Sequence, residues 1–285
     1  MKKKIIYAAG ILLPVFSVIC SLSFSLFSAQ EALEASAGEE KELPVIMYHA
    51  LTPDPAYRNL YFIPPSCLEE DLEFIKANGY TTVTVSDLTA YTEKRGDLPD
   101  KPIMLIFDDG YYNNLKYALP LLQRYDMEAV IAPVGKTADE YSMTDDRNER
   151  YAYLSWDDLR RMQLSGHFEI QDHTYDLHHI KDGIQGVMKY PWESDEDHRK
   201  RLEDDLTHFQ ERAASVLLKV PEAFIYPYGA YDEKSEEIIR ALGFRATFTC
   251  TEGFNVITRD RECLFLMKRF LRSEGRSVSD IINGR

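Results

Sequence analysis

The sequence predicts a mixed α/β fold, a (β/α) barrel with seven or eight strands. Short apolar runs alternate with amphipathic helical patterns along the chain, as in proteins built from strand–helix units. The number of such units, seven or eight, favours a barrel over an open sheet. With 285 residues, of which 45% are hydrophobic, the chain can bury one substantial core, so we expect one large domain.

The apolar runs predict the strands of this barrel. Because helical patterns separate them, the strands should be parallel and joined by right-handed crossovers. In chain order the predicted strands are 45–48, 81–85, 103–107, 129–134, 168–171, 223–226, 245–249 and 264–270.

Capping residues predict where helices begin. Ser66, Ser155 and Asp232 each precede a helical pattern that a glycine ends. The charged segment 194–219 predicts a long amphipathic helix on the outside of the barrel. Segment 180–193 interrupts the alternation, and it could line a substrate groove or be an uncommitted surface loop.

Charge and cysteine content narrow the classes of partner. The net charge of −14 argues against a nucleic-acid or anionic-membrane surface. It suits a neutral or cationic substrate, but a well-solvated surface explains it more simply. Four cysteines do not form a disulfide framework, because Cys20 lies in the apolar N-terminal segment. Cys250 and Cys263 could pair in an oxidising compartment, but dispersed buried thiols are the simpler interpretation.

The N-terminus predicts entry into a membrane. Three lysines at positions 2–4 precede an uncharged apolar stretch over 5–27. We therefore expect a signal peptide or N-terminal membrane anchor at 1–29, a flexible tether at 30–42 and the folded domain at 43–285. Either interpretation of the first segment places the domain outside the cytoplasm, anchored or secreted, and touching the membrane through that segment only.

Two adjacent acids mark the most informative strand. Asp108 and Asp109 end the apolar run 103–107, and Gly110 follows them. Burying acids is expensive, and regular alternation would point the two side chains to opposite faces. Both acids can therefore serve one site only where the strand frays into its loop, unless the pair merely caps that loop.

Three further strand ends carry polar groups. His173 and His178 follow the strand at 168–171, and with a carboxylate they could hold a divalent cation or else form a surface cluster. The turn Pro227-Tyr228-Gly229 can expose a backbone N–H to a ligand or simply end a strand. His49 ends the first predicted strand. Four such ends at one rim of a barrel favour a single functional site.

These motifs resemble those of the NodB-homology polysaccharide deacetylases, carbohydrate esterase family 4. Ile106-Phe107-Asp108-Asp109-Gly110 is similar to the first family motif, His173-Thr174 with His178 to the second, and Tyr226-Pro227-Tyr228-Gly229 to the third. His178 comes five residues after His173, and Met47-Tyr48-His49 lies upstream. This pattern resembles that of the family branch that acts on poly-β-1,6-N-acetylglucosamine. The resemblance covers the chain from Leu43 onward and implies the family's distorted barrel.

The resemblance also implies a reaction and its residues. Asp109, His173 and His178 would hold a divalent metal, commonly Zn²⁺ and in some members Co²⁺, Ni²⁺ or Fe²⁺. Asp108 would be the general base toward the attacking water, and the backbone N–H of Tyr228 would complete the oxyanion hole. The expected activity is hydrolysis of acetamide groups on N-acetylglucosamine units of an extracellular or cell-envelope polysaccharide. We expect a monomer that binds no nucleic acid.

Two departures from the family pattern leave an alternative open. Ile225 stands where the family usually carries an arginine that orients the base, and segment 264–272 offers no histidine for the usual general acid. We hypothesise that His49 supplies that proton, with Arg269, Asp172 and Trp156 as possible supporting residues. The alternative is a catalytically weak or inactive carbohydrate-binding envelope protein with a degenerate site.

Overall fold

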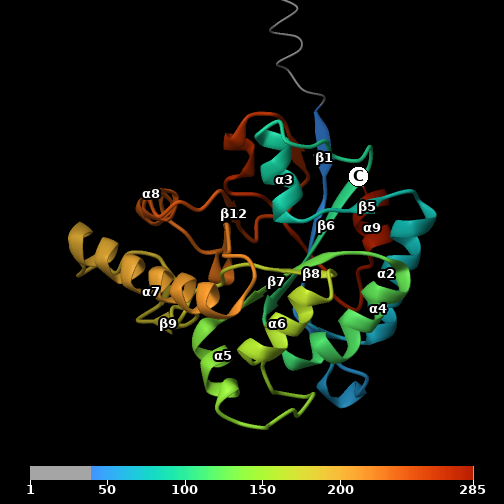
Figure 1. The fold of residues 1–285 in the computed structure, drawn as a ribbon, viewed down its shortest axis with the longest axis horizontal. Helices are drawn as coiled ribbons and strands as arrows, with labels where there is room; N and C mark the ends of the chain where they lie inside the picture. The colour runs from blue at the N-terminus through green and yellow to red at the C-terminus, as the bar shows by residue number, and fades with distance from the viewer. Residues whose placement is uncertain (1–39, 285) are drawn as a thin grey trace, which may run out of the picture. The chain divides into compact units, whose positions relative to one another are not determined.

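Two parallel sheets form the centre of the domain (Figure 1). The structure, a computed structural model, describes residues 40–284, and its compact unit begins at Lys41. Strand β5 (Thr81–Thr82) pairs with the beginning of β6. The larger sheet has the order β14 (Phe270–Leu271), β2 (Val45–Tyr48), β6 (Pro102–Asp109), β7 (Ala129–Pro133) and β8 (Phe168–Ile170), and the smaller sheet pairs β11 (Ala223–Ile225) with β12 (Ala246–Phe248).

Isolated bridges link the two sheets at both edges. Asp172, just beyond β8, bridges Phe224 of β11, and Phe248 of β12 bridges Met267, just before β14. These parallel links complete a circuit around the core without a continuous ladder. The strands therefore form a distorted barrel, as the alternation of strands and helices predicts.

Helices surround the strands. Figure 1 shows α2, α4 and α9 on one flank and the long α7 on another, with α5 and α6 between them. No helix within residues 40–284 is long and apolar enough to cross a membrane. The helices are α2 (Pro65–Ala77), α3 (Val85–Thr92), α4 (Leu119–Tyr125), α5 (Gly135–Ser142), α6 (Trp156–Leu164), α7 (Asp195–Val216), α8 (Glu233–Ala241) and α9 (Val278–Asn283).

Two of the three predicted caps are confirmed. Ser155 and Asp232 accept hydrogen bonds from backbone N–H groups of α6 and α8, and both belong to capping boxes. The prediction for Ser66 is wrong, because α2 begins at Pro65, whose missing N–H is tolerated in a first turn. The predicted strand at 81–85 ends early because Thr84 caps α3.

Segments outside the predicted strands extend the fold at its edges. β1 (Lys41–Leu43) pairs antiparallel with β13 (Asn255–Ile257), so the folded part begins two residues before the predicted boundary and takes in the end of the predicted tether. The predicted signal or anchor and most of that tether lie outside the described residues. The predicted strand at 264–270 divides into a 3₁₀ turn (Arg261–Leu264) and the short β14.

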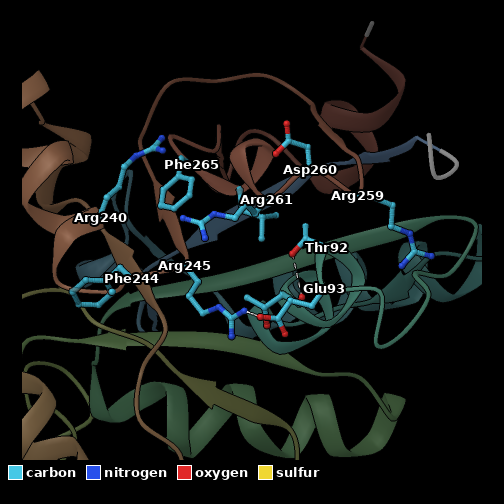
Figure 2. Close-up of a pocket in the computed structure, with 12 residues that line it drawn as sticks. Thr92, Glu93, Arg240, Phe244, Arg245, Arg259, Asp260, Arg261 and Phe265 are labelled. Carbon is cyan, nitrogen blue, oxygen red and sulfur yellow. Dashed lines mark hydrogen bonds and ion pairs between the residues drawn. The ribbon is translucent and has the colours of Figure 1, made fainter. Parts of the chain in front are cut away.

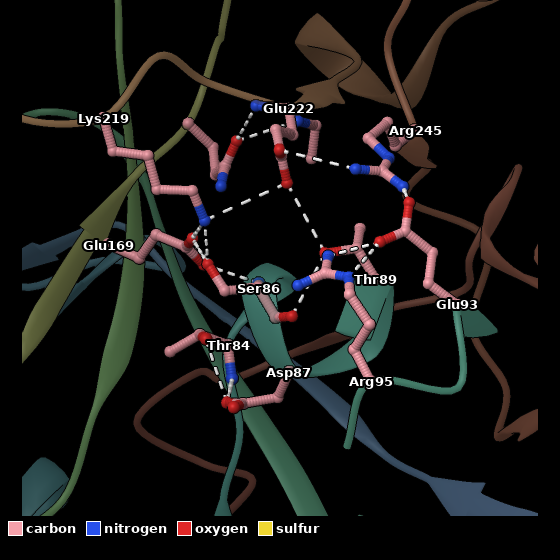
Figure 3. Close-up of polar contacts among 12 residues, drawn as sticks. Thr84, Ser86, Asp87, Thr89, Glu93, Arg95, Glu169, Lys219, Glu222 and Arg245 are labelled. Atoms are coloured by element: carbon pink, nitrogen blue, oxygen red, sulfur yellow. Dashed lines mark hydrogen bonds and ion pairs between the residues drawn. The ribbon is translucent and has the colours of Figure 1, made fainter. Parts of the chain in front are cut away.

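A network of polar side chains lies at the amino ends of the strands (Figure 3). Glu169 of β8 accepts hydrogen bonds from the Ser86 backbone N–H at 3.1 Å and from Lys219 Nζ at 2.8 Å. Beside it, Arg245 pairs with Glu93, the residue that caps the carboxyl end of α3. Buried charges are tolerated when paired, so this network fastens α3 across the end of the barrel.

A cavity of about 610 Å³ adjoins the network (Figure 2). Four arginines line it, and each lies beside at least one carboxylate: Arg240 beside Glu236 and Glu262, Arg245 beside Glu93, Arg259 beside Asp97, and Arg261 beside Glu262. Because the carboxylates compensate these charges, we interpret the cavity as part of the structural ion-pair network. The polar groups predicted to carry chemistry lie at the other end of the strands.

Candidate active site

The carboxyl ends of the strands meet at a pocket of about 560 Å³. All six predicted site residues line this pocket, so the structure brings them together. Its volume lies within the range common for small-ligand sites. The pocket is lined by Met47, His49, Tyr61, Phe62, Asp108, Asp109, Tyr111, His173, His178, Gln185, Tyr228, Cys250, Glu252 and Leu271.

Asp108 and Asp109 face this one pocket for a different reason from the one predicted. The strand does not fray, because both acids still pair with β7, opposite Ala132 and Pro133. Instead Asp109 adopts a left-handed backbone with φ of +69°, which breaks the alternation of side chains. Gly110 follows with φ of +76°, and a Cβ there would lie 2.7 Å from that of Pro133. The glycine lets the strand turn away immediately after the second acid.

Asp109, His173 and His178 converge on one point. His173 Nε2 lies 3.5 Å and His178 Nε2 3.2 Å from Asp109 Oδ1, and the three ligand atoms lie within 4.8 Å of one another. Burial alone would raise the pKa of Asp109, but the hydrogen bond from His173 and the nearby imidazoles hold it well below its usual range.

The environment of His173 suits a metal ligand. Its Nδ1–H donates to the carbonyl oxygen of Ile225 at 2.7 Å, so Nε2, which faces Asp109, is the nitrogen that can bind a cation once it has lost its proton. A backbone carbonyl that fixes the tautomer in this way is common behind metal-binding histidines. Two imidazole nitrogens and one carboxylate oxygen therefore fit a divalent cation such as Zn²⁺.

A buried carboxyl group shapes the loop between the two histidines. Asp172 accepts a hydrogen bond from the Thr174 backbone N–H at 2.7 Å, and Thr174 has a φ of +74°. Burial raises the pKa of Asp172 well above its usual range. The tight turn brings the imidazole rings of His173 and His178 to 4.9 Å between centroids despite their spacing of five. Asp172 thus supports the site through the backbone of the loop.

Arg269 lies where Asp108 needs a cation. Its Nη1 donates to both carboxylate oxygens of Asp108, at 2.8 and 2.9 Å, and its Nε donates to the Thr249 carbonyl at 2.8 Å. The side chains are 0% and 3% exposed, so the pair is completely desolvated. Burial alone would raise the pKa of Asp108, but Arg269 and the neighbouring histidines hold it below its usual value.

Arg269 fills the place that the sequence left open at Ile225. The side chain of Ile225 lies in the core, whereas Arg269 reaches Asp108 from the strand segment before β14. Trp156, another residue suggested by the sequence, lies elsewhere. Its indole N–H donates to Asp139 of α5 at 2.8 Å and its ring packs against Phe209 of α7, so it stabilises helix packing.

Tyr228 and Gly229 form a strained turn beside His178. Their φ values are +60° and +67°, and the Tyr228 ring lies 4.7 Å from the His178 ring between centroids. Backbone bonds run from the Gly229 N–H to Tyr226 and from the Ala230 N–H to Pro227, so neither bond uses the N–H of Tyr228. Such a turn suits a donor reserved for a ligand.

Replacing Gly229 by alanine is expected to disrupt this turn. An added Cβ would lie 2.4 Å from the backbone nitrogen of Cys250, and a backbone atom cannot move aside as a flexible side chain could. We expect a loss of about 2 kcal/mol or more in the free energy of unfolding, measured by urea denaturation. Gly243→Ala is the matched control, because Gly243 has a φ of +92° but nothing within 4 Å of an added Cβ. Equal losses in the two variants would contradict the steric argument.

His49 lies in the pocket with an unused nitrogen. Its ring contacts that of Tyr61 at 4.7 Å between centroids, and its buried Nδ1 has no hydrogen-bond partner within the described part of the chain. Burial lowers the pKa of His49, although Asp108 and Asp109 oppose this effect.

Several lining residues were not singled out from the sequence. Aromatic side chains form one wall, where the Tyr111 ring meets that of Phe62 edge-on at 5.1 Å and stacks on that of Tyr153 at 4.8 Å. Cys250 lies beside Arg269 Nη2 at 3.5 Å, and Cys67, Cys250 and Cys263 are all free thiols, as expected. The sequence could have indicated this aromatic wall, because two tyrosines directly follow Gly110.

Comparisons with known proteins agree with this geometry. The family model described as polysaccharide deacetylase matches residues 95–247, more than half of the chain. The poly-β-1,6-N-acetyl-D-glucosamine N-deacetylase of Escherichia coli O157:H7 is 25% identical over 226 residues, which cover 73% of this chain. Those residues are 34% of that relative, so the chain spans about a third of its length.

Solved structures share the fold. A de-N-acetylase from Aggregatibacter actinomycetemcomitans superposes with a TM-score of 0.74 at 25% identity, covering 85% of this chain and 99% of that one. IcaB from Ammonifex degensii gives 0.68 at 22% identity, covering 86% and 95%, and supports the fold alone. The family model is named for deacetylation, and both named relatives that are described by activity remove acetyl groups from nitrogen, which is hydrolysis of a carbon–nitrogen bond other than a peptide bond, as the resemblance implied. From its motifs, its fold and the match over residues 95–247, this chain belongs to the polysaccharide deacetylase family.

Proposed function

We propose that the protein is a metal-dependent de-N-acetylase of N-acetylglucosamine units in an extracellular or cell-envelope polysaccharide. The observation that supports this most directly is the convergence of Asp109, His173 and His178 beside the buried Asp108–Arg269 pair. A binding protein would have little use for a buried ionised carboxylate next to such a donor set. The E. coli relative is named for a poly-β-1,6-linked substrate, which makes that polymer the first candidate here.

Asp109, His173 and His178 would hold the cation. A divalent ion such as Zn²⁺, Co²⁺, Ni²⁺ or Fe²⁺ bound there would supply Lewis-acid polarisation of the acetamide and acidify water. The chain's own contribution is to keep Asp109 ionised and to direct Nε2 of each imidazole toward the same point.

Asp108 is the proposed general base. Arg269 engages both of its oxygens and favours the ionised form, so the carboxylate can accept a proton from the water that attacks the acetyl carbon. The backbone N–H of Tyr228 would donate to the oxygen on which negative charge develops. As the C–N bond breaks, acetate leaves and the sugar nitrogen takes up a proton to become an amine.

His49 is the proposed donor of that proton. If so, its imidazolium form is required, and because burial lowers its pKa, turnover should decline as pH rises through a value below the ordinary histidine range. We expect His49→Ala to lower kcat about 10²-fold and to remove this decline from the pH profile. An unchanged rate and profile would show that another group protonates the amine.

Acetate release is the direct test of the function. Peptidoglycan and β-1,6- and β-1,4-linked N-acetylglucosamine oligomers are each incubated with the full chain, with and without added Zn²⁺, Co²⁺ or Ni²⁺. We expect release from at least one polymer that stops on chelation and returns when metal is added. No release from any polymer, with metal content verified, would favour the carbohydrate-binding alternative.

The proposed location is outside the cytoplasm, where such polymers occur. It rests on the predicted signal or anchor at 1–29. The domain would then act as a monomer on polymer strands near the membrane surface.

A further inference from the structure

The insertion at residues 180–193 is fixed to the domain and contributes Gln185 to the lining of the pocket. Val187 is fully buried, and its carbonyl accepts a hydrogen bond from Nε2 of the buried His198 of α7 at 2.8 Å. The Lys189 backbone N–H donates to Asp232, the cap of α8, at 2.7 Å. Anchors on two helices are incompatible with an uncommitted surface loop.

A tight hairpin at the beginning of this insertion places one of its residues, Gln185, at the pocket. Strands β9 (Ile180–Lys181) and β10 (Ile184–Gln185) pair with Ile180 opposite Gln185. Asp182 and Gly183, between the strands, have φ values of +52° and +80°, as in the type I′ turns that fix a hairpin register. The backbone therefore holds Gln185 at a defined position.

The hairpin lies directly against the Tyr228 turn. A Cβ on Gly186 would lie 3.2 Å from the Pro227 side chain, so the two backbones approach closely here. Gln185 lines the same pocket as Asp108, His173 and Tyr228. Its side chain thus approaches the reacting group from the side of the oxyanion turn.

Gln185 is half-buried, and its carboxamide has no hydrogen-bond partner within residues 40–284. The neighbouring charged groups Asp108 and Asp109, by contrast, are both engaged. A bound sugar would take water away from this amide, so a ligand group must replace the lost hydrogen bonds or binding weakens. A carboxamide both donates and accepts, which matches a sugar hydroxyl.

We propose that Gln185 is a specificity-determining residue that hydrogen-bonds a ring hydroxyl of the N-acetylhexosamine whose acetamide lies at Asp108. The proposal rests on the proposed function, because it assumes a sugar in this pocket. Through this contact the hairpin selects the configuration of the hydroxyl, so epimeric N-acetylhexosamines should differ in binding.

Gln185→Met tests the contact, since methionine keeps the length of the side chain and removes the amide. The probes are β-1,6-linked oligomers of N-acetylglucosamine and of N-acetylgalactosamine of equal length, which differ in the configuration of the free C4 hydroxyl of each unit. We expect KM for the preferred oligomer to rise about fivefold to tenfold with kcat little changed, and the preference between epimers to shrink by a similar factor.

Ile180→Ala is the matched control, because Ile180 pairs with Gln185 across the hairpin but is 56% exposed and does not line the pocket. A similar rise in KM for both variants would indicate hairpin damage and overturn the proposal. An active Gln185→Met enzyme with unchanged KM and epimer preference would also overturn it. Failure of the proposed function would differ, since the unmodified chain would then release no acetate from either oligomer.

Discussion

Replacing Asp108 by asparagine is expected to lower kcat by about 10² to 10⁴ with little change in KM. Asparagine keeps the size of the side chain and can still accept a hydrogen bond from Arg269, but it cannot take a proton from water. Steady-state acetate release, with bound metal quantified in parallel, measures the effect. Metal content should be unchanged because Asp109, His173 and His178 are intact.

Asp71→Asn separates loss of the base from loss of a buried ion pair. Asp71 also lies buried against an arginine, with Arg272 Nε at 2.6 Å and the Tyr48 hydroxyl at 2.9 Å, but it does not line the pocket. We expect Asp71→Asn to reduce stability and to leave kcat within about twofold of the unmodified enzyme. Equal losses of kcat in the two variants would mean that Asp108 matters only for folding.

Arg269→Met is expected to affect both stability and the acidic limb of the pH profile. Removing one partner of a buried ion pair typically costs about 3–5 kcal/mol in the free energy of unfolding. Arg269 also keeps the pKa of Asp108 low, so without it this pKa should rise. A base must be ionised to act, so activity is lost as pH falls through its pKa, and the acidic limb should move toward neutral pH. Urea denaturation and the pH dependence of kcat/KM measure the two effects.

Arg269→Lys and Arg272→Met are the control variants for this prediction. Arg269→Lys retains a positive charge but not the paired contact, so it should fold and shift the limb less. Arg272→Met removes the neighbouring buried arginine, which pairs with Asp71 away from the pocket, and should destabilise the fold without moving the limb. A limb that shifts equally with Arg272→Met would refute a positioning role for Arg269.

Patterns confined to neighbouring residues predicted the fold and the position of the site well. The apolar run before Asp108 predicts β6 because a strand buried on both faces needs continuous apolar residues. Its adjacent acids, and the histidines after β8, predict one rim because parallel strands end on the same side. The family resemblance made the assignment of ligands specific.

Local sequence patterns do not predict features that depend on residues far apart in the chain or on individual backbone angles. Arg269 was suggested as a supporting residue, but it lies 161 positions from Asp108, and nothing local to an arginine in an apolar run identifies that partner. The left-handed backbone of Asp109 could not be read from an aspartate before glycine, so the predicted fraying was wrong. Pro64 and Pro65 start α2 in place of Ser66, since proline at the first position already suits a helix.

His173 joins the two sheets of the barrel in addition to facing the proposed metal site. Beyond β8 the two sheets are joined by the Asp172–Phe224 bridge, and the bond from His173 Nδ1 to Ile225 crosses the same gap. The His173 imidazole therefore connects the two sheets through Nδ1, while its Nε2 faces Asp109. The joint between β8 and β11 and the group Asp109, His173 and His178 must therefore form together. A chain in which these two strands separate also loses the arrangement of the three proposed metal ligands.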